Sequence, residues 1–195
     1  MKQCFAVLIA ALLFLFAGCS MLGMRGSKDK AVTGKVTIDF TLTRISGTGS
    51  NQYASWIEDE TGRYVRTLFV TDYMARRQGW KARQQSLVNW VKAADVKNKP
   101  QSDIDALSGA TPKAGKLSLV WDLKDTTGKA AFAGDYVYRI EGCLLNENHV
   151  LWTGKIRVGG AKGTSQATSI HFPEGADKLG RTLISDVSAV YDATP

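Results

Sequence analysis

A short stretch near the middle of the chain has the residue types best suited to chemistry. Residues 105–111 read Asp-Ala-Leu-Ser-Gly-Ala-Thr, and Pro112 follows directly. Proline biases the preceding residue toward extended backbone, which tends to hold the Thr111 side chain away from a helix. Gly109 adds a hinge, because it has no side chain to restrict the backbone. The stretch is therefore either a connector between two elements or the place where a covalent group joins the Thr111 hydroxyl.

The usual catalytic and metal-binding residues are scarce elsewhere. His149 and His171 lie in no recognisable motif, so they support neither a catalytic triad nor a zinc site. No Gly-x-Gly-x-x-Gly or P-loop pattern occurs. Carboxylates gather at expected hairpin turns, where acids are common, rather than as a glycosidase pair or a calcium site: Glu58, Asp59, Glu60, Asp122 and Asp125. The sequence predicts a protein that is not an enzyme and that binds no metal.

The first 18 residues have the pattern of an export signal. Lys2 supplies a positive charge, and the apolar run over residues 4–16 is too short for a comfortable transmembrane helix. The small residues directly before Cys19 resemble the lipobox of bacterial lipoproteins, which are cleaved before the cysteine and lipidated on it. Phe16 stands where that box usually has leucine, and Ser20 resembles the pattern of outer-membrane lipoproteins. An ordinary cleaved signal peptide and an uncleaved anchor are the alternatives.

The rest of the chain has the size of one domain. Without residues 1–18 the 195-residue chain keeps 177 residues, and its net charge falls from +7 to +6 because Lys2 is lost. The charges are scattered, so acidic lipid headgroups or a phosphorylated ligand are expected partners and nucleic acid is not. Residues 19–34, rich in glycine, serine and lysine, are predicted to be a flexible tether to a single domain over residues 35–195.

Cysteine usage indicates that the core holds this domain together without a disulfide. Cys4 is lost with the signal and Cys19 would carry lipid, which leaves Cys143 alone. An exported protein without a cysteine pair has no internal disulfide. Cys143 is interpreted as a small buried hydrophobic residue.

Short segments of strand-like sequence fill most of the domain. Residues 36–43 alternate apolar and polar side chains, and residues 53–58 and 63–70 flank a turn that closes with Gly62. Further strands are expected at residues 117–123, 136–145, 150–158, 168–172 and 182–191. Seven or eight short strands at near-regular spacing predict a mainly β chain, folded as an antiparallel two-sheet β-sandwich.

One helical insertion, at about residues 74–112, interrupts the strands. Between residues 80 and 94 the apolar residues fall on one helical stripe: Trp80, Leu87, Trp90, Val91 and Ala94. Basic residues crowd the start of this helix or the loop before it: Arg76, Arg77, Lys81 and Arg83. They could form an ordinary solvated face or a patch that contacts phosphate, because arginine forks match phosphate oxygens.

Motifs spread along the domain resemble a bacterial family of predicted periplasmic proteins of unknown function. They occur in the family's order: Trp56-Ile-Glu-Asp59, Gly62-Arg-Tyr-Val-Arg-Thr-Leu68, the tryptophan-containing helix, residues 105–111, Val120-Trp-Asp122, Gly128 and Gly134-Asp-Tyr136. The segment over residues 120–136 also resembles the Ig-like domain of the flagellar hook-capping protein. That second resemblance implies an Ig-like architecture and no flagellar role.

Residues 105–111 are similar to the Asp-x-x-Ser/Thr-Gly-Ala-Thr motif of covalently flavinylated proteins. These include the FMN-carrying subunits of the sodium-translocating quinone reductase. In that family a separate FAD-dependent transferase attaches FMN to the last threonine through a phosphoester bond. The resemblance implies attachment at Thr111, space for the flavin phosphate at Gly109 and Ala110, and recognition or orienting roles for Asp105 and Ser108.

Together these features predict a lipid-anchored protein on the periplasmic face of a bacterial membrane, with the outer membrane as one candidate. We expect it to serve extracytoplasmic electron transfer, either as a covalent FMN carrier or as an accessory to a membrane redox protein. The basic cluster would lie near the flavin phosphate if the helical insertion folds back over Thr111, with Arg76 and Arg77 as the candidate cofactor-binding residues among Arg76, Arg77, Lys81 and Arg83. The alternative is a cofactor-free Ig-like interaction or structural module of the cell envelope.

Overall fold

A computed structural model shows how these segments fold. It describes residues 31–46, 49–76, 78–144, 149–172 and 182–193. The predicted signal peptide, Cys19, most of the predicted tether and Arg77 therefore lie outside the described residues. Among the helices that the structure describes, none is long and apolar enough to cross a membrane.

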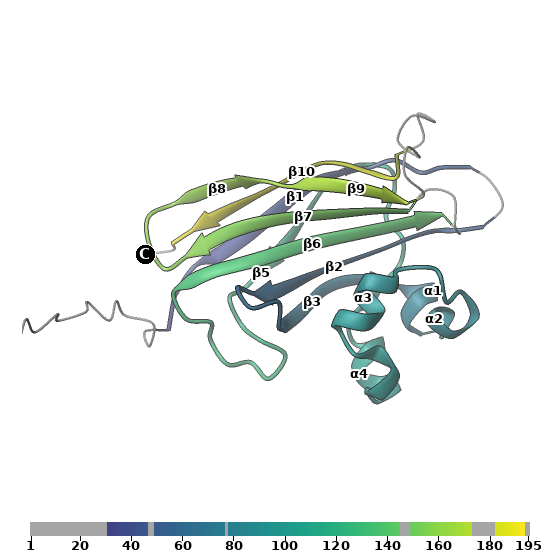
Figure 1. Cartoon of the computed structure of the whole chain (residues 1–195), viewed down its shortest axis with the longest axis horizontal. Helices are drawn as coiled ribbons and strands as arrows, with labels where there is room; N and C mark the ends of the chain where they lie inside the picture. Colours follow the sequence, from purple (N-terminus) through teal and green to yellow (C-terminus); the bar gives the residue numbers. More distant parts are fainter. Residues whose placement is uncertain (1–30, 47–48, 77, 145–148, 173–181, 194–195) are drawn as a thin grey trace, which may run out of the picture.

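The chain forms two β-sheets, which confirms the prediction of a mainly β, two-sheet sandwich (Figure 1). The four-stranded sheet has the order β5-β1-β10-β8, with β1 at Lys35–Leu42, β5 at Gly115–Trp121, β8 at Gly163–Gln166 and β10 at Ile184–Asp192. The six-stranded sheet has the order β4-β3-β2-β6-β7-β9, with β2 at Asn51–Asp59, β3 at Tyr64–Thr71, β4 at Ser108–Gly109, β6 at Gly134–Leu144, β7 at His149–Val158 and β9 at Thr168–Phe172. Neighbouring strands are antiparallel except for β3 and β4, which are parallel.

The described chain has ten strands, so the expected seven or eight was too few. The two strands that were missed are β4, only two residues long, and β8, which lies between two of the expected strands. Both are short and polar, so neither has the alternation of apolar residues that predicts a strand. Hydrogen bonding to β3 and to β10, rather than burial of side chains, defines them.

The main hydrophobic core lies between the sheets. The predicted inward face of β1 is buried throughout, with Val36, Ile38, Phe40 and Leu42 each at most 2 % exposed. These side chains pack with inward residues of the six-stranded sheet such as Tyr138. Burying one side chain of this kind contributes about 1.5–3 kcal/mol, so a strand with four of them is firmly held.

Short helices between β3 and β4 cover the outer face of the six-stranded sheet at one end of the molecule (Figure 1). They are α1 at Asp72–Ala75, α2 at Gly79–Ala82, α3 at Val88–Ala93, the 3-10 helix η1 at Val96–Asn98 and α4 at Gln101–Asp105. A second core forms beneath them, where Met74, Leu87 and Trp90 pack with Ala54 and Trp56 of β2.

The single helix expected over residues 80–94 is two helices, α2 and α3. Residues 83–87 separate them, and Leu87 at the end of this turn has a left-handed backbone (φ 51°). A leucine in this region is strained, but its side chain is fully buried in the second core, which offsets the cost. The buried stripe was predicted well, and the continuity of the helix was not.

Two hairpin turns at the opposite end of the sandwich have the same construction. In the turn after β2, Asp59 Oδ1 accepts hydrogen bonds from the Thr61 amide and hydroxyl and from the Arg63 amide. In the turn after β5, Asp125 Oδ1 accepts hydrogen bonds from the equivalent three groups of Thr127 and Lys129. Gly62 and Gly128 close the turns with positive φ, which explains the repeated Asp-x-Thr-Gly sequence.

These turns make stability depend on acid pH. Burial raises the pKa of Asp59, but hydrogen bonds from Thr61 and Arg63 outweigh it and hold the pKa below its ordinary value. The hydroxyl of Thr127, followed by backbone amides, lowers the pKa of Asp125. A carboxylate whose pKa is depressed by folding stabilises the fold above the unfolded pKa of about 3.9, and the effect is lost as pH falls through the folded pKa.

We therefore expect the urea midpoint to fall as the pH is lowered below about 4. The double variant Asp59→Asn/Asp125→Asn keeps an oxygen acceptor in each turn but cannot titrate. Its midpoint should be lower than that of the natural protein at pH 7 and should change less between pH 7 and pH 3. An unchanged pH slope in the double variant would show that other carboxyl groups control acid unfolding.

Candidate functional site

The Asp105 and Ser108 side chains shape the turn that leads from α4 into β4. Ser108 Oγ donates a hydrogen bond to the Asp105 backbone oxygen at 2.8 Å. The Asp105 carboxylate accepts one from Gln101 Nε2 at 2.7 Å, and the same nitrogen donates to the Ala75 oxygen at 2.9 Å. Asp105 thus helps to join α4 to α1, and both motif residues fix the backbone that precedes Thr111.

Gly109 is required by close packing. It lies in β4, paired with Thr71 of β3, and an added Cβ would lie 2.7 Å from Phe69 Cε2. The Phe69 ring cannot easily withdraw, because it is stacked on Tyr53 with 4.7 Å between ring centroids. A residue with a side chain here would push β4 away from β3 or displace the stacked rings.

Thr111 lies in a surface depression of about 570 Å³ next to β4. Eight residues line this depression, and we call it the Thr111 depression: Ser50, Gln52, Asp72, Tyr73, Arg76, Gly109, Ala110 and Thr111. The Thr111 side chain is half-buried, and its hydroxyl has no hydrogen-bond partner among the residues that the structure describes. Ala110 is exposed. The hydroxyl is therefore neither deeply buried nor committed to the backbone.

A chain of hydrogen bonds fixes the floor of the Thr111 depression. Thr71 Oγ1 donates to Gln52 Oε1 at 2.5 Å, and Gln52 Nε2 donates to Ser50 Oγ at 2.6 Å. Gln52 is 1 % exposed, so its amide is satisfied within the protein rather than by solvent. The same Ser50 oxygen accepts a hydrogen bond from Arg83 at 3.3 Å.

Two of the four predicted basic residues lie at the Thr111 depression. Arg76 lines it and forms an ion pair with Asp72, with Nε 3.3 Å from Oδ1. The Arg83 guanidinium carbon lies 4.6 Å from the centroid of the Tyr73 ring, which also lines the depression. Lys81 instead contacts Trp80 on another surface, with 5.0 Å from Nζ to the ring centroid.

Sequence reasoning missed a buried carboxylate beneath α3. Glu141 lies in β6 with none of its surface exposed. Its Oε2 accepts a hydrogen bond from the Trp90 amide at 2.8 Å, and its Oε1 accepts from the Asn89 amide at 3.1 Å and Nδ2 at 2.9 Å. His149 Nε2 of β7 is also hydrogen-bonded to Oε1. Glu141 thus attaches α3 to the sheet.

A signal for this carboxylate exists in the sequence. The residue directly before α3 is Leu87, which has no side-chain oxygen to accept hydrogen bonds from the first amides of the helix. An acceptor must then come from elsewhere in the chain. Glu141 shares one face of a strand with Cys143, so a charged side chain there calls for a buried partner.

The described residues contain no group of three histidine, cysteine, aspartate or glutamate side chains that could hold a metal ion. Glu141 and His149 are only two such groups, and the amides of α3 occupy both carboxylate oxygens. Their arrangement is that of a structural cap rather than of a catalytic pair.

Cys143 lies beside this cap and is buried. Burial raises the pKa of its thiol to about 11, and the thiol lies 3.8 Å from Ser86 Oγ. Because the thiolate is the reactive form, Cys143 should be inert at neutral pH. The test uses exported protein that lacks Cys4 and Cys19, so that Cys143 is its remaining cysteine. We expect 5,5′-dithiobis(2-nitrobenzoate) to label this thiol only after the protein is unfolded in urea. Rapid labelling of the folded protein would contradict the buried position.

The geometry defines a class of protein: a two-sheet β-sandwich whose helical segment and strand β4 present a threonine hydroxyl in a surface depression. The chain belongs to the DUF2271 family of predicted periplasmic proteins, whose model matches residues 34–171. The match begins just before β1 and includes the helices and residues 105–111, which confirms the resemblance to a predicted periplasmic family. No curated protein and no solved structure matches the chain.

Proposed function

We propose that this protein is a lipid-anchored periplasmic carrier of covalently bound FMN, with the flavin on Thr111, that serves extracytoplasmic electron transfer. The observation that carries the proposal is the unpartnered Thr111 hydroxyl, which lines a surface depression beside Arg76. Cys19 would carry the lipid, and the outer membrane is the proposed location. The chain itself is a carrier and not an enzyme, so its partners are a flavin transferase and a membrane redox protein.

Small residues and two arginines support phosphate binding at the Thr111 depression, where Asp72 also lies and is ion-paired with Arg76. Gly109 and Ala110 present little side chain beside Thr111, so an approaching phosphate meets mainly backbone. Arg76 lines the same depression, and Arg83 lies on its Tyr73 wall. Guanidinium groups bind phosphate oxygens through paired N–H donors, so these two arginines would hold the phosphoester once it has formed.

The attachment reaction uses FAD as its donor. The Thr111 oxygen forms a bond to the phosphorus of the FMN half, the bond between the two phosphates of FAD breaks, and AMP leaves. The hydroxyl proton passes to a base of the transferase. Bound FMN supplies reversible one- and two-electron transfer, while this chain's own residues position the phosphate and restrain the loop.

Co-expression with a flavin transferase in the periplasm tests the proposal. A denaturing gel should show flavin fluorescence at the mass of the mature protein, because a phosphoester bond survives denaturation. Mass spectrometry should find one FMN, less one water, on the peptide that contains Thr111. A non-fluorescent band at full expression, alongside a fluorescent known carrier, would rule out the carrier function.

A second candidate function is a cofactor-free Ig-like interaction module of the envelope. The observation that favours it is the edge strand β9, where Ile170 and Phe172 are 59 % and 41 % exposed. Apolar side chains on an open strand edge favour pairing with another chain. The pairing of Ser108 and Gly109 with β3 also gives part of the motif a structural role. Absence of flavin in the co-expression experiment would leave this candidate standing.

A further inference from the structure

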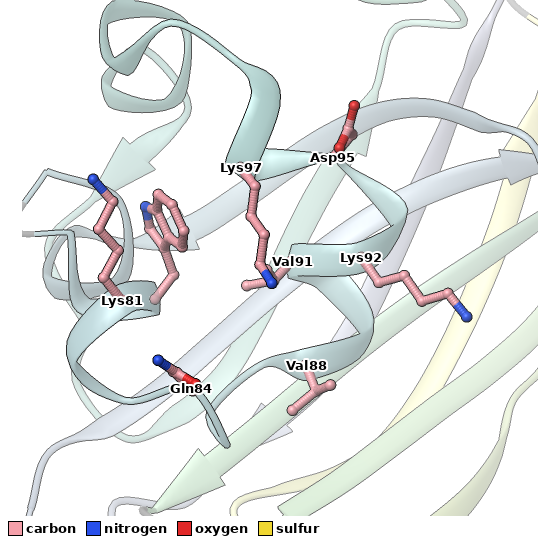
Figure 2. A pocket seen from close by; sticks show the side chains of 8 residues that line it. Lys81, Gln84, Val88, Val91, Lys92, Asp95 and Lys97 are labelled. Carbon is pink, nitrogen blue, oxygen red and sulfur yellow. The ribbon is translucent and has the colours of Figure 1, made fainter.

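A second concave surface lies on the helical segment, and its lining residues differ from those of the Thr111 depression. It is a groove of about 520 Å³ whose lining residues come from α2, α3, η1 and the turns beside them (Figure 2). Its floor is apolar: Trp80 and Val91 are half-buried, and Val88 is 45 % exposed. We call it the Trp80 groove. Its volume is typical of a site for one small molecule.

The rim of the Trp80 groove carries three lysines, Lys81, Lys92 and Lys97. Within the part of the chain that the structure describes, none of them forms an ion pair with a carboxylate. The only acid in the lining, Asp95, accepts a hydrogen bond from Asn98 at 2.8 Å. The groove therefore has an uncompensated positive charge.

The lysines differ in direction. Figure 2 shows the Lys97 side chain reaching from η1 back toward Val91, whereas Lys92 extends away from it at the other side. Each has a long flexible stem, so its ammonium group can move to a bound anion at little cost in strain. An apolar floor below mobile positive charges is complementary to a molecule with one apolar and one anionic part.

The indole of Trp80 in the groove floor also has a nitrogen without a hydrogen-bond partner. Trp80 Nε1 is buried and has no hydrogen bond, a state shared in the described residues only by Ser55 Oγ. An unsatisfied buried N–H costs free energy. Because the same ring lines the groove, an acceptor on a bound molecule that reached this nitrogen would satisfy it.

We propose that the Trp80 groove binds an anionic amphiphile, a small molecule with an apolar ring system or chain and one carboxylate, sulfonate or phosphate group. The apolar part packs on Trp80, Val88 and Val91, and the anionic group pairs with Lys92 and Lys97. The concave floor favours a single molecule over a flat bilayer surface, because Trp80 and Val91 are recessed. This site does not depend on flavin at Thr111, so the two can fail separately.

Two dyes that share one ring system and differ by a sulfonate group test the proposal on the full mature protein. The anionic probe is 8-anilinonaphthalene-1-sulfonate, and the uncharged probe is N-phenyl-1-naphthylamine. At low salt, the natural protein should bind the sulfonate dye at one site and more tightly than it binds the uncharged dye. Lys92→Gln/Lys97→Gln should weaken sulfonate binding about tenfold and leave the uncharged dye unchanged, because two point charges in water account for about that factor.

Matched variants separate the groove from the rest of the surface. Lys116→Gln/Lys155→Gln removes two exposed lysines elsewhere and should leave both dyes unchanged. Val88→Asp places a negative charge at an exposed position of the groove and should weaken the binding of both dyes. Equal affinity for the two dyes in the natural protein, an equal effect of the two lysine pairs, or full sulfonate binding by Val88→Asp would each overturn the proposal.

A membrane contact is the other occupant that the experiment distinguishes. Vesicles of phosphatidylcholine with phosphatidylglycerol should bind the natural protein and Lys92→Gln/Lys97→Gln equally if the groove takes a small molecule. Vesicle binding that the double variant abolishes, together with unchanged dye binding, would assign the lysines to a lipid surface and overturn the proposal.

Discussion

Thr111→Ala, co-expressed with a flavin transferase, is expected to give a protein that reaches full expression but carries no flavin. The reason is chemical: the phosphoester needs a side-chain oxygen, and alanine has none. The effect should be complete rather than partial, because a neighbouring hydroxyl cannot substitute. Ser108 Oγ already donates to the Asp105 backbone, and its residue lies in the paired strand β4. Flavin fluorescence of the denatured band measures the outcome.

Three comparisons make this result specific. Thr111→Ser keeps a hydroxyl and should retain flavin, although a primary alcohol on a less restricted side chain will be modified at a different rate. Thr126→Ala removes an exposed hydroxyl in a distant turn and should have no effect. Since Thr111 is only half-buried, the free energy of unfolding of Thr111→Ala should lie within about 0.5 kcal/mol of that of the natural protein. Flavin retained in Thr111→Ala would place the attachment on another residue.

Two arginine variants would extend the result from the oxygen to its surroundings. Arg76→Gln removes the guanidinium that lines the Thr111 depression, and Arg83→Gln removes the one on Tyr73. If they hold the phosphate, each should slow flavin loading without changing the modified residue. Both side chains keep enough surface contact with solvent that the fold should tolerate the change.

Much of the fold could be predicted from the sequence because burial leaves a pattern. The alternation in β1 indicated which face is buried, and all four predicted inward residues of this strand are in the core. Strand β8 has no such pattern, because Gly163–Gln166 is polar and its residues alternate between half-buried and exposed. Its place depends on hydrogen bonds to β10, which connect residues far apart in the chain. Contacts of that kind are set by the tertiary fold.

In the helical segment, too, the sequence predicted which side chains are buried but not the course of the backbone. The apolar stripe predicted the buried positions Leu87, Trp90 and Ala94, since a hydrophobic period reports burial. It did not predict the break between α2 and α3, which ends at Leu87 with a left-handed backbone. The sequence also did not show which of the basic residues face Thr111, because that depends on how α1 and α2 are oriented.

The candidate site was predicted as a motif with basic residues beside it, and most of its other neighbours were not predicted. Residues 105–111 were singled out from their types and spacing, whereas Tyr73, Gln52 and Ser50 enter the Thr111 depression only through the fold. Gln52 lies in β2, more than fifty residues before the motif, and its buried side chain accepts a hydrogen bond from Thr71 of β3. A local pattern contains no information about such neighbours.

The carboxylate beneath α3 leads to the second large expected effect. Glu141→Ala should lower the free energy of unfolding by about 3–5 kcal/mol, because several donors beneath α3 lose their acceptor together. The loss has several parts, because the Asn89 and Trp90 amides, the Asn89 side chain and His149 all lose their acceptor. Buried donors left without partners each cost about 1–3 kcal/mol. Urea unfolding followed by tryptophan fluorescence measures the change.

A carboxylate on the same strand provides the matched control. Asp135 also lies in β6, but its ion pair with Arg157 is exposed, with side chains 45 % and 76 % accessible. Asp135→Ala should therefore cost no more than about 1 kcal/mol, as expected for a surface pair. The loss for Glu141→Gln should fall between those of the two alanine variants. Its amide oxygen can still accept a hydrogen bond from α3, but its amide nitrogen would face a donor and cannot accept one. Equal losses for Glu141→Ala and Asp135→Ala would mean that α3 is held by the packing of Trp90 alone, and that the carboxylate contributes little to anchoring it.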